Sequence, residues 1–234
     1  GNLVGALTLA AGIVAAGTGS RMNTAVRKQF LQLKDKPILV HAVEVFEGMP
    51  EVSEIVIVTG SSDINRVDQY ISMYHWHKIK AIVPGGSDRQ QSVYYGLQAV
   101  SSETEWVLIH DGVRPFVTPE AALRCLEGAA STGAAVLAVP VKDTIKQIND
   151  AGQIVATLER TSLRAIQTPQ AFRRSLILEA HRTAMEQGWQ ATDDAALAEM
   201  MGHAVVAVDG DYRNIKITTP EDLAVAEQLL GGEA

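Results

Sequence analysis

Short apolar runs alternate with amphipathic stretches along most of the chain. The apolar runs predict six strands, over residues 8–14, 54–59, 80–83, 106–110, 134–140 and 205–208. Helical periodicity predicts seven helices, over residues 38–47, 63–74, 89–100, 119–132, 174–187, 192–201 and 220–230. This alternation is typical of βαβ units. We therefore predict an α/β fold, with a mostly parallel sheet and helices on both of its faces.

One segment departs from this alternation. Residues 141–148 and 153–159 alternate polar and apolar positions around Asn149-Asp150-Ala151-Gly152, which predicts an inserted β-hairpin. A two-stranded hairpin is marginally stable alone and needs a surface to pack against. The sequence leaves open whether that surface belongs to a partner subunit or to the hairpin's own domain. We predict one domain over residues 1–234, with a β-arm at about 141–160.

Polar clusters follow three of the predicted strands, at the edge where open parallel sheets bind ligands. The cluster after the first strand, AAGTGSR over residues 15–21, has two glycines and small neighbours. Such a segment turns sharply and brings backbone N–H groups near an anion. Arg21 and Lys28 add two positive charges beside it. The pattern is neither the dinucleotide fingerprint nor a Walker loop, and a bare structural turn stays open as an alternative.

Composition and charge restrict the ligand. The 234 residues carry a formal net charge of −7, so no overall basic field attracts nucleic acid. An anionic ligand must be held by local Arg and Lys side chains. The one cysteine, Cys125, lies in a helical pattern and is expected to be a core thiol. The apolar stretch 3–16 is too short to span a membrane and follows no basic region, so we expect a cytoplasmic protein.

The cluster Gly85-Gly86-Ser87-Asp88-Arg89 precedes a predicted helix and has two interpretations. In the first, Asp88 or Ser87 caps the helix, as short polar side chains do at such positions. In the second, exposed backbone groups and Ser92 recognise the edge of a flat base. Both interpretations stay open on the sequence alone.

The fourth predicted strand leads into His110-Asp111-Gly112-Val113-Arg114. A carboxylate at a strand end beside a phosphate loop suits Mg²⁺ or a sugar hydroxyl, so Asp111 is a candidate metal ligand. In the alternative, Arg114 simply forms an ion pair with Asp111. His110 ends an apolar strand, and we expect it to be a hydrogen-bonded core residue.

Basic and hydroxyl side chains gather in and after the predicted hairpin. They lie in Lys142-Asp143-Thr144, Glu159-Arg160-Thr161 and Gln167-Thr168-Pro169-Gln170. Separately, each segment is open to interpretation as a turn or a solvated face. Together they suggest a second anion site that faces the first across the edge of the sheet. Lys216 lies near a further strand end, where a solvent-facing lysine is the alternative to a ligand contact.

Several classes of chemistry have no support in this sequence. There is no His-x-x-x-His, no pair of cysteines and no serine nucleophile elbow, which leaves zinc chemistry and acyl transfer without their usual residues. What remains is a set of cations and backbone amides around phosphates. That is how phosphoryl-type transfer is catalysed.

Taken in their order along the chain, these motifs resemble those of one family, the 2-C-methyl-D-erythritol 4-phosphate cytidylyltransferases of the non-mevalonate isoprenoid pathway. The resemblance runs from about residue 7 to residue 230. The segments that carry it are AAGTGSRM, KQF at 28–30, GGSDR, HDGVRP, VKDTIK, ERTSL, QTPQAF, TDDA and NIKIT. Each segment is modest alone, but the ordered set is highly specific.

The resemblance implies transfer of CMP from CTP to methylerythritol phosphate, with Mg²⁺ and with release of diphosphate. It implies a Rossmann-like fold of the nucleotide-diphospho-sugar transferase type, and a homodimer formed through the β-arm. By position, the catalytic residues would be Arg21, Lys28, Arg160 and Lys216. The nucleotide-binding residues would be Ala15, Ala16, Gly17, Gly19, Gly85, Asp88, Ser92, Asp111 and Gly112. The acceptor-binding residues, some of them on the partner's arm, would be Arg114, Thr144, Arg160, Thr168 and Lys216.

The chemistry agrees with this resemblance. The attacking group is already an anionic phosphate oxygen, so no general base is needed, and nearby cations remove the repulsion between two anions. The chain departs from the family's usual pattern at three places. Arg27 replaces a proline, Arg164 replaces an aromatic residue, and Ile13-Val14 stands where Ile-Pro is common. None of these changes removes a charged catalytic position.

Two rival hypotheses stay open. The first is the same reaction with ribitol 5-phosphate as the acceptor, although the segment ERTSL around Arg160 favours the methylerythritol enzyme. The second is a CTP-binding protein without catalysis. The joint presence of Arg21, Lys28, Arg160 and Lys216 argues against it, because binding alone does not require all four.

Overall fold

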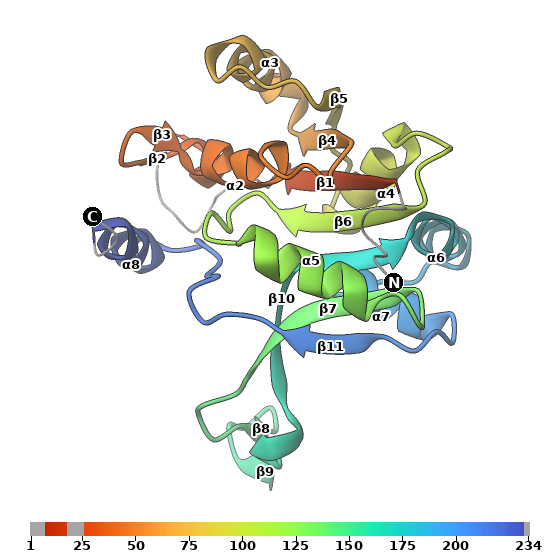
Figure 1. The fold of residues 1–234 in the computed structure, drawn as a ribbon. Helices are drawn as coiled ribbons and strands as arrows, with labels where there is room; N and C mark the ends of the chain where they lie inside the picture. Colours follow the sequence, from red (N-terminus) through yellow and green to blue (C-terminus); the bar gives the residue numbers. More distant parts are fainter. Residues whose placement is uncertain (1–7, 18–25, 232–234) are drawn as a thin grey trace.

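A computed structural model describes the chain over residues 8–17 and 26–231. Its main sheet is built from β1 (Leu9–Ala15), β4 (Glu54–Thr59), β5 (Ile79–Pro84), β6 (Trp106–Asp111), β7 (Ala134–Pro140), β10 (Arg164–Arg173) and β11 (Val206–Asp209). The strands lie in the order β11-β7-β10-β6-β1-β4-β5 (Figure 1). All neighbouring pairs are parallel except those of β10, which is antiparallel to β6 and to β7. The predicted mostly parallel sheet is therefore confirmed.

Helices cover both faces of this sheet. On one face lie α2 (Ile38–Glu47), α3 (Ile64–Met73) and α5 (Pro119–Gly128). On the other face lie α4 (Arg89–Ala99), α6 (Arg174–Gln187) and α7 (Asp194–Met200). Successive residues of β1 alternate between the two cores, with Leu9 and Ala11 in the first core and Ala10 in the second. This burial on both sides explains why the strand is a continuous apolar run.

A third, smaller core contains Leu33, Val113 and Ile217. It lies between α8 (Pro220–Gly231) and the short antiparallel pair β2 (Gln32–Leu33) and β3 (Lys36–Pro37). Val113 lies two residues after Asp111, and Ile217 directly follows Lys216. This core therefore holds together the two segments that contain these candidate site residues. The amide of Ile217 donates to the carbonyl of Val113 at 2.9 Å.

The periodicity of the sequence predicts these elements well. All six predicted strands and all seven predicted helices are present, and most ends lie within two residues of the prediction. The largest difference is in α5, which ends at Gly128 rather than at residue 132. No helix in the described part of the chain is long and apolar enough to cross a membrane.

In the main sheet, β10 is the strand that the periodicity of the sequence does not predict. The interpretation of its segment Gln167-Thr168-Pro169-Gln170 as a turn or a solvated face is wrong, because these residues are buried between β6 and β7. Polar residues and a proline in mid-strand contradict the usual strand signal. They are tolerated because the polar groups find partners. The Gln170 amide, for example, donates to Asp193 Oδ2 at 3.0 Å.

The predicted hairpin is present, but it is shorter than predicted. It consists of β8 (Lys146–Ile148) and β9 (Ile154–Thr157), joined by a turn in which Asn149 Oδ1 accepts hydrogen bonds from the turn backbone. Figure 1 shows the hairpin projecting beyond the ends of β7 and β10. Its apolar residues Ile148, Ile154 and Val155 are 60–64% exposed. These side chains are therefore not packed against the part of their own domain that the structure describes.

Candidate active site

The strand order of the sheet reverses at β1, since β4 and β5 lie on one side of it and β6 lies on the other. Open α/β sheets bind ligands at such a point, at the carboxyl ends of the strands. A cavity of about 300 Å³ opens there. Of the residues proposed from the sequence, those that line it are Ala15, Ala16, Gly17, Lys28, Asp88, Ser92, Asp111 and Lys216. Gly19 and Arg21 lie outside the described residues.

The first wall of the cavity is the segment that follows β1. The Gln29 amide nitrogen donates to the carbonyl oxygens of Ala15 at 2.8 Å and Gly17 at 3.0 Å. Because these two carbonyls point at Gln29, their negative ends are directed toward an amide donor instead of toward an anion in the cavity. Gln29 is almost fully buried, and although it lies in the KQF motif, it is not among the site residues proposed from the sequence. Its position beside Lys28 is the signal that could have found it.

The second wall is the loop that precedes α4. The Asp88 side chain accepts from the amide of Gln91 at 2.8 Å, so the helix-capping interpretation of Asp88 is confirmed. The hydroxyl of Ser92 accepts from the amide of Gly86 at 3.0 Å and donates to the carbonyl of Asp88 at 2.8 Å. These bonds fix the backbone of the loop. The loop thus presents a rigid backbone to the cavity.

Gly85 marks the place where the two walls touch. A Cβ atom at this position would lie 2.6 Å from the Ala16 Cβ and 2.8 Å from the Ser92 Oγ. Gly112 is equally confined, since a Cβ there would lie 2.9 Å from Leu39 Cδ1. Both glycines therefore shape the walls of the cavity from behind.

The third wall holds the buried carboxylate of Asp111 at the end of β6. Oδ1 accepts from Arg89 Nη2 at 3.0 Å. Oδ2 lies 3.6 Å from Arg114 Nε, so the predicted ion pair is present, and 3.7 Å from Lys216 Nζ. Burial opposes ionisation of the carboxyl, but the charges of Arg89, Lys216 and Arg114 outweigh it and hold the pKa of Asp111 well below its usual range. Asp111 is therefore ionised at neutral pH.

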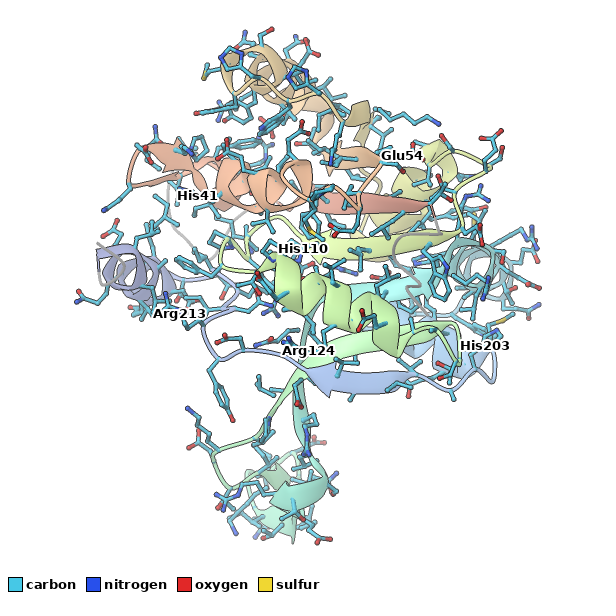
Figure 2. The ribbon with its side chains drawn as sticks, viewed as in Figure 1. His41, Glu54, His110, Arg124, His203 and Arg213 are labelled. Atoms are coloured by element: carbon cyan, nitrogen blue, oxygen red, sulfur yellow. The ribbon has the colours of Figure 1, made fainter. Side chains whose placement is uncertain are left out.

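Residues beneath Asp111 hold its backbone. The amide of Asp111 donates to the Thr168 hydroxyl at 3.0 Å, and this hydroxyl also bonds His110 Nδ1 at 3.0 Å. His110 Nε2 lies 2.9 Å from the carbonyl of Arg114, where it donates. Burial lowers the pKa of His110 to about 4, so its ring is neutral. His110, near the middle of the view in Figure 2, is thus confirmed as a hydrogen-bonded core residue.

Three residues that the sequence assigned to acceptor binding sit differently. Thr168 is buried under Asp111 and does not line the cavity. Thr144 and Arg160 are exposed near the hairpin, and Arg160 Nη1 donates to the carbonyl of Lys142 at 2.6 Å. None of the three lines the cavity, and neither does Arg114, so of the proposed acceptor-binding residues the structure brings only Lys216 to the cavity wall.

The departure at Arg27 has a structural partner. Arg27 Nη1 lies 3.0 Å from Asp63 Oδ2, and the Asp63 side chain is only 6% exposed. The Arg27 charge is therefore matched by a carboxylate shortly after the end of β4. This ion pair connects the segment next to Lys28 to the short 3-10 helix Ser61–Asp63 that follows β4.

Comparison with known proteins decides the family. Residues 9–232 match the family model described as 2-C-methyl-D-erythritol 4-phosphate cytidylyltransferase. The chain belongs to this family. It is 48% identical over 219 residues to the enzyme of that name from Desulforamulus reducens, covering 93% of this chain and 94% of that protein. It is 46% identical over 221 residues to the one from Bacillus licheniformis, covering 94% and 95%.

Solved structures of cytidylyltransferases agree with this membership. The 4-diphosphocytidyl-2C-methyl-D-erythritol synthase from Anaerococcus prevotii has a TM-score of 0.88 at 31% identity, with 99% of both chains covered. The 2-C-methyl-D-erythritol 4-phosphate cytidylyltransferase from Thermus thermophilus has a TM-score of 0.75 at 31% identity, covering 94% of this chain and 98% of that one. The cavity at β1 thus belongs to a nucleotidyltransferase of this family.

The described residues around the cavity of this cytidylyltransferase supply only some of the ligands that a hard divalent cation needs. The described residues contain no group of three or more His, Cys, Asp or Glu placed to hold a metal ion. Asp111 offers one ionised carboxylate, and its Oδ2 is the oxygen that Arg89 leaves free. Mg²⁺ is commonly held by one or two carboxylates together with substrate phosphates and water. The donor set fits an ion that arrives with a triphosphate.

Proposed function

We propose that this chain transfers CMP from CTP to 2-C-methyl-D-erythritol 4-phosphate, giving 4-diphosphocytidyl-2-C-methyl-D-erythritol and diphosphate. The observation that carries the proposal is the cavity at the β1 switch point, in a chain that belongs to the cytidylyltransferase family. This cavity combines a glycine-containing segment, two lysines and one buried carboxylate. All of these features suit a nucleoside triphosphate and a second phosphate.

In the proposed reaction, a phosphate oxygen of the acceptor attacks the α-phosphorus of CTP. A new P–O bond forms, the bond between the α-phosphorus and the bridging oxygen breaks, and diphosphate leaves with the electron pair. The nucleophile is already ionised, so the site needs cations rather than a base. Lys28 and Lys216 line the cavity and supply such charge. Lys216 is 41% exposed and 3.7 Å from Asp111, which leaves its ammonium room to turn toward a phosphate.

The proposed nucleotide position follows the three walls. The base lies against the fixed backbone of the loop before α4, next to Gly85 and Ser92. The ribose lies near Asp111, and the triphosphate lies along Ala15–Gly17 beside Lys28. The roles of Gly19 and Arg21 stay predictions from the sequence.

We include Mg²⁺ in the proposal. It would be held by Asp111 Oδ2 and the phosphates of CTP, and it would neutralise charge on the leaving diphosphate. The low pKa of Asp111 supports this, because the carboxylate stays ionised throughout the neutral range.

We also propose that the enzyme is a cytoplasmic homodimer in which the β-arm of one protomer reaches the site of its partner. The exposed apolar side chains of β8 and β9 support this, because they need a surface to cover them. The exposed positions of Arg160 and Thr144 outside their own cavity support it as well. In the dimer, Arg160 would bind the acceptor phosphate from the partner's side.

The test is diphosphate release from CTP with Mg²⁺, using methylerythritol phosphate and ribitol 5-phosphate as parallel acceptors. We expect release with methylerythritol phosphate only. Release with ribitol 5-phosphate alone would keep the chemistry but overturn the acceptor. CTP binding without release from either acceptor would support a binding protein and refute the proposed function.

A further inference from the structure

We propose that Arg89 is a positioning residue, held by the buried pair Asp194 and His181, and that it fixes Asp111 so that Oδ2 faces the ligand. The inference rests on the proposed function, because Asp111 acts there on nucleotide and metal. It assigns work to three residues that the mechanism above leaves unused. These residues come from α4, α7 and α6, which all pack on the same face of the sheet.

Arg89 is bonded to two carboxylates at once. Its Nε and Nη2 donate to Asp111 Oδ1 at 3.3 and 3.0 Å, and its Nη1 donates to Asp194 Oδ2 at 3.1 Å. Although Arg89 lines the cavity, its charge is thus shared between two carboxylates. Those carboxylates raise the pKa of the guanidinium above its ordinary value despite its burial. Arg89 therefore orients Asp111 rather than binding substrate phosphate.

Asp194 is the buried anchor of this arrangement. Its side chain is 1% exposed, and its second oxygen, Oδ1, accepts from His181 Nε2 at 2.9 Å. The His181 ring stacks parallel to Tyr94 of α4, with ring centroids 6.3 Å apart. Both oxygens of Asp194 therefore have fixed partners. A carboxylate held at both oxygens holds the guanidinium in one place.

Asp194 is not needed to cap the N-terminus of α7. The neighbouring Asp193 caps α7, since its Oδ1 accepts from the amide of Ala196 at 2.9 Å. Burying a second, adjacent carboxylate is costly unless it is paired, and the only Lys or Arg bonded to Asp194 among the described residues is Arg89. The buried charge of Asp194 is explained by the orientation of Arg89.

As a consequence, the two carboxylate oxygens of Asp111 have different partners. Two of the three hydrogen bonds of Arg89 engage Asp111 Oδ1, which leaves Oδ2 on the side of Arg114 and Lys216. Without the guanidinium fork, Oδ1 loses both of these hydrogen bonds, and only the more distant Arg114 and Lys216, beside Oδ2, restrain the carboxylate. Lysine cannot reproduce this, because its single ammonium cannot bridge two carboxylates with a planar fork.

The test uses Asp194→Asn in the full chain, with Asp193→Asn as the matched control. Partners of this kind that orient metal-site carboxylates are typically worth about 10- to 100-fold in activity or metal affinity. We expect kcat/KM for CTP to fall by about this factor in Asp194→Asn, with a higher Mg²⁺ concentration at half-saturation. Asp193→Asn keeps a capping oxygen but loses the acceptor of the Gln170 amide, so it is expected to lower the melting temperature without changing the Mg²⁺ dependence. Equal losses in both variants would overturn the proposal.

If Asp194→Asn does not fold, two substitutions of His181, to Leu and to Gln, test the positioning role instead. Gln places an amide donor near the position of Nε2, whereas Leu offers none. We expect His181→Leu to shift the Mg²⁺ dependence and His181→Gln to restore it. Wild-type Mg²⁺ dependence in His181→Leu would refute the role of the pair.

Failure of the proposed function is separable from failure of this inference. If the wild-type chain releases no diphosphate with methylerythritol phosphate, the function is refuted. In that case, the same variants are compared by the Mg²⁺ dependence of CTP binding in calorimetry. A shift in Asp194→Asn but not in Asp193→Asn still supports the positioning role, and identical binding in both overturns it.

Discussion

Gln29 offers a direct test of how the phosphate-facing segment is held. Replacing it with Met keeps the length of the side chain but removes the donor to the carbonyls of Ala15 and Gly17, at 2.8 and 3.0 Å. A net contribution of about 1 kcal/mol per hydrogen bond gives a loss of about 2 kcal/mol. Two details reduce this figure. Gln29 Oε1 has no hydrogen-bond partner among the described residues, so its loss leaves no described donor unpaired, and the Thr59 hydroxyl still reaches the Ala15 carbonyl at 3.4 Å.

The loss of about 2 kcal/mol is therefore an upper value, and for a chain of this size it lowers the melting temperature by at most roughly 4–8 °C. If the same energy positions the segment for the triphosphate, KM for CTP rises by up to about 30-fold, since 1.4 kcal/mol is a factor of ten. Thermal unfolding and diphosphate release at varied CTP measure the two effects. Gln187→Met, at an exposed position on α6, is the control and is expected to change neither. A Gln29→Met enzyme with wild-type melting temperature and KM would refute the reasoning.

Three further predictions concern acceptor use, pH and the single thiol. Lys216→Ala or Arg160→Ala is expected to impair use of the acceptor. The loss of a donor that contacts the reacting phosphates raises the barrier by about 2.7–4 kcal/mol. Steady-state kinetics with varied methylerythritol phosphate measure this effect, and an unchanged kcat/KM would contradict the prediction. Burial lowers the pKa of His110 from 6.5 to about 4, so the folded state keeps it neutral while the unfolded state takes up a proton. Its contribution is complete above pH 6.5 and is lost as the pH falls toward 4, by up to about 3 kcal/mol. Urea unfolding at several pH values should therefore show a shallower decline in His110→Gln, and an identical decline would contradict the assignment. Burial raises the pKa of Cys125 to about 12, so a thiol reagent should label it only on unfolding, as followed by mass spectrometry; rapid labelling of the folded enzyme would show that the thiol is accessible.

Local sequence patterns predict most of the site because most of its walls are local structures. The segments after β1 and before α4 are short loops whose glycines and capping residues lie within a few positions of one another. Asp88 and Gln91 are an example, since their hydrogen bond spans three residues. Asp111 follows from the same logic, because it ends an apolar strand at the edge where ligands bind. The order of these motifs along the chain is specific enough to indicate the family.

The parts that the sequence did not predict depend on contacts between distant segments. β10 has no apolar periodicity of its own, and it becomes a strand because β6 and β7 supply partners on both sides. The hydroxyl of Thr168 reaches the amide of Asp111 across 57 residues of sequence, and Arg89 reaches Asp194 across 105. The sequence alone determined the helices, the loops and most of the strands, because the periodic burial of these elements is a local pattern. Only the tertiary structure decided which buried charges meet, because that depends on how α4, α6 and α7 pack over one face of the sheet.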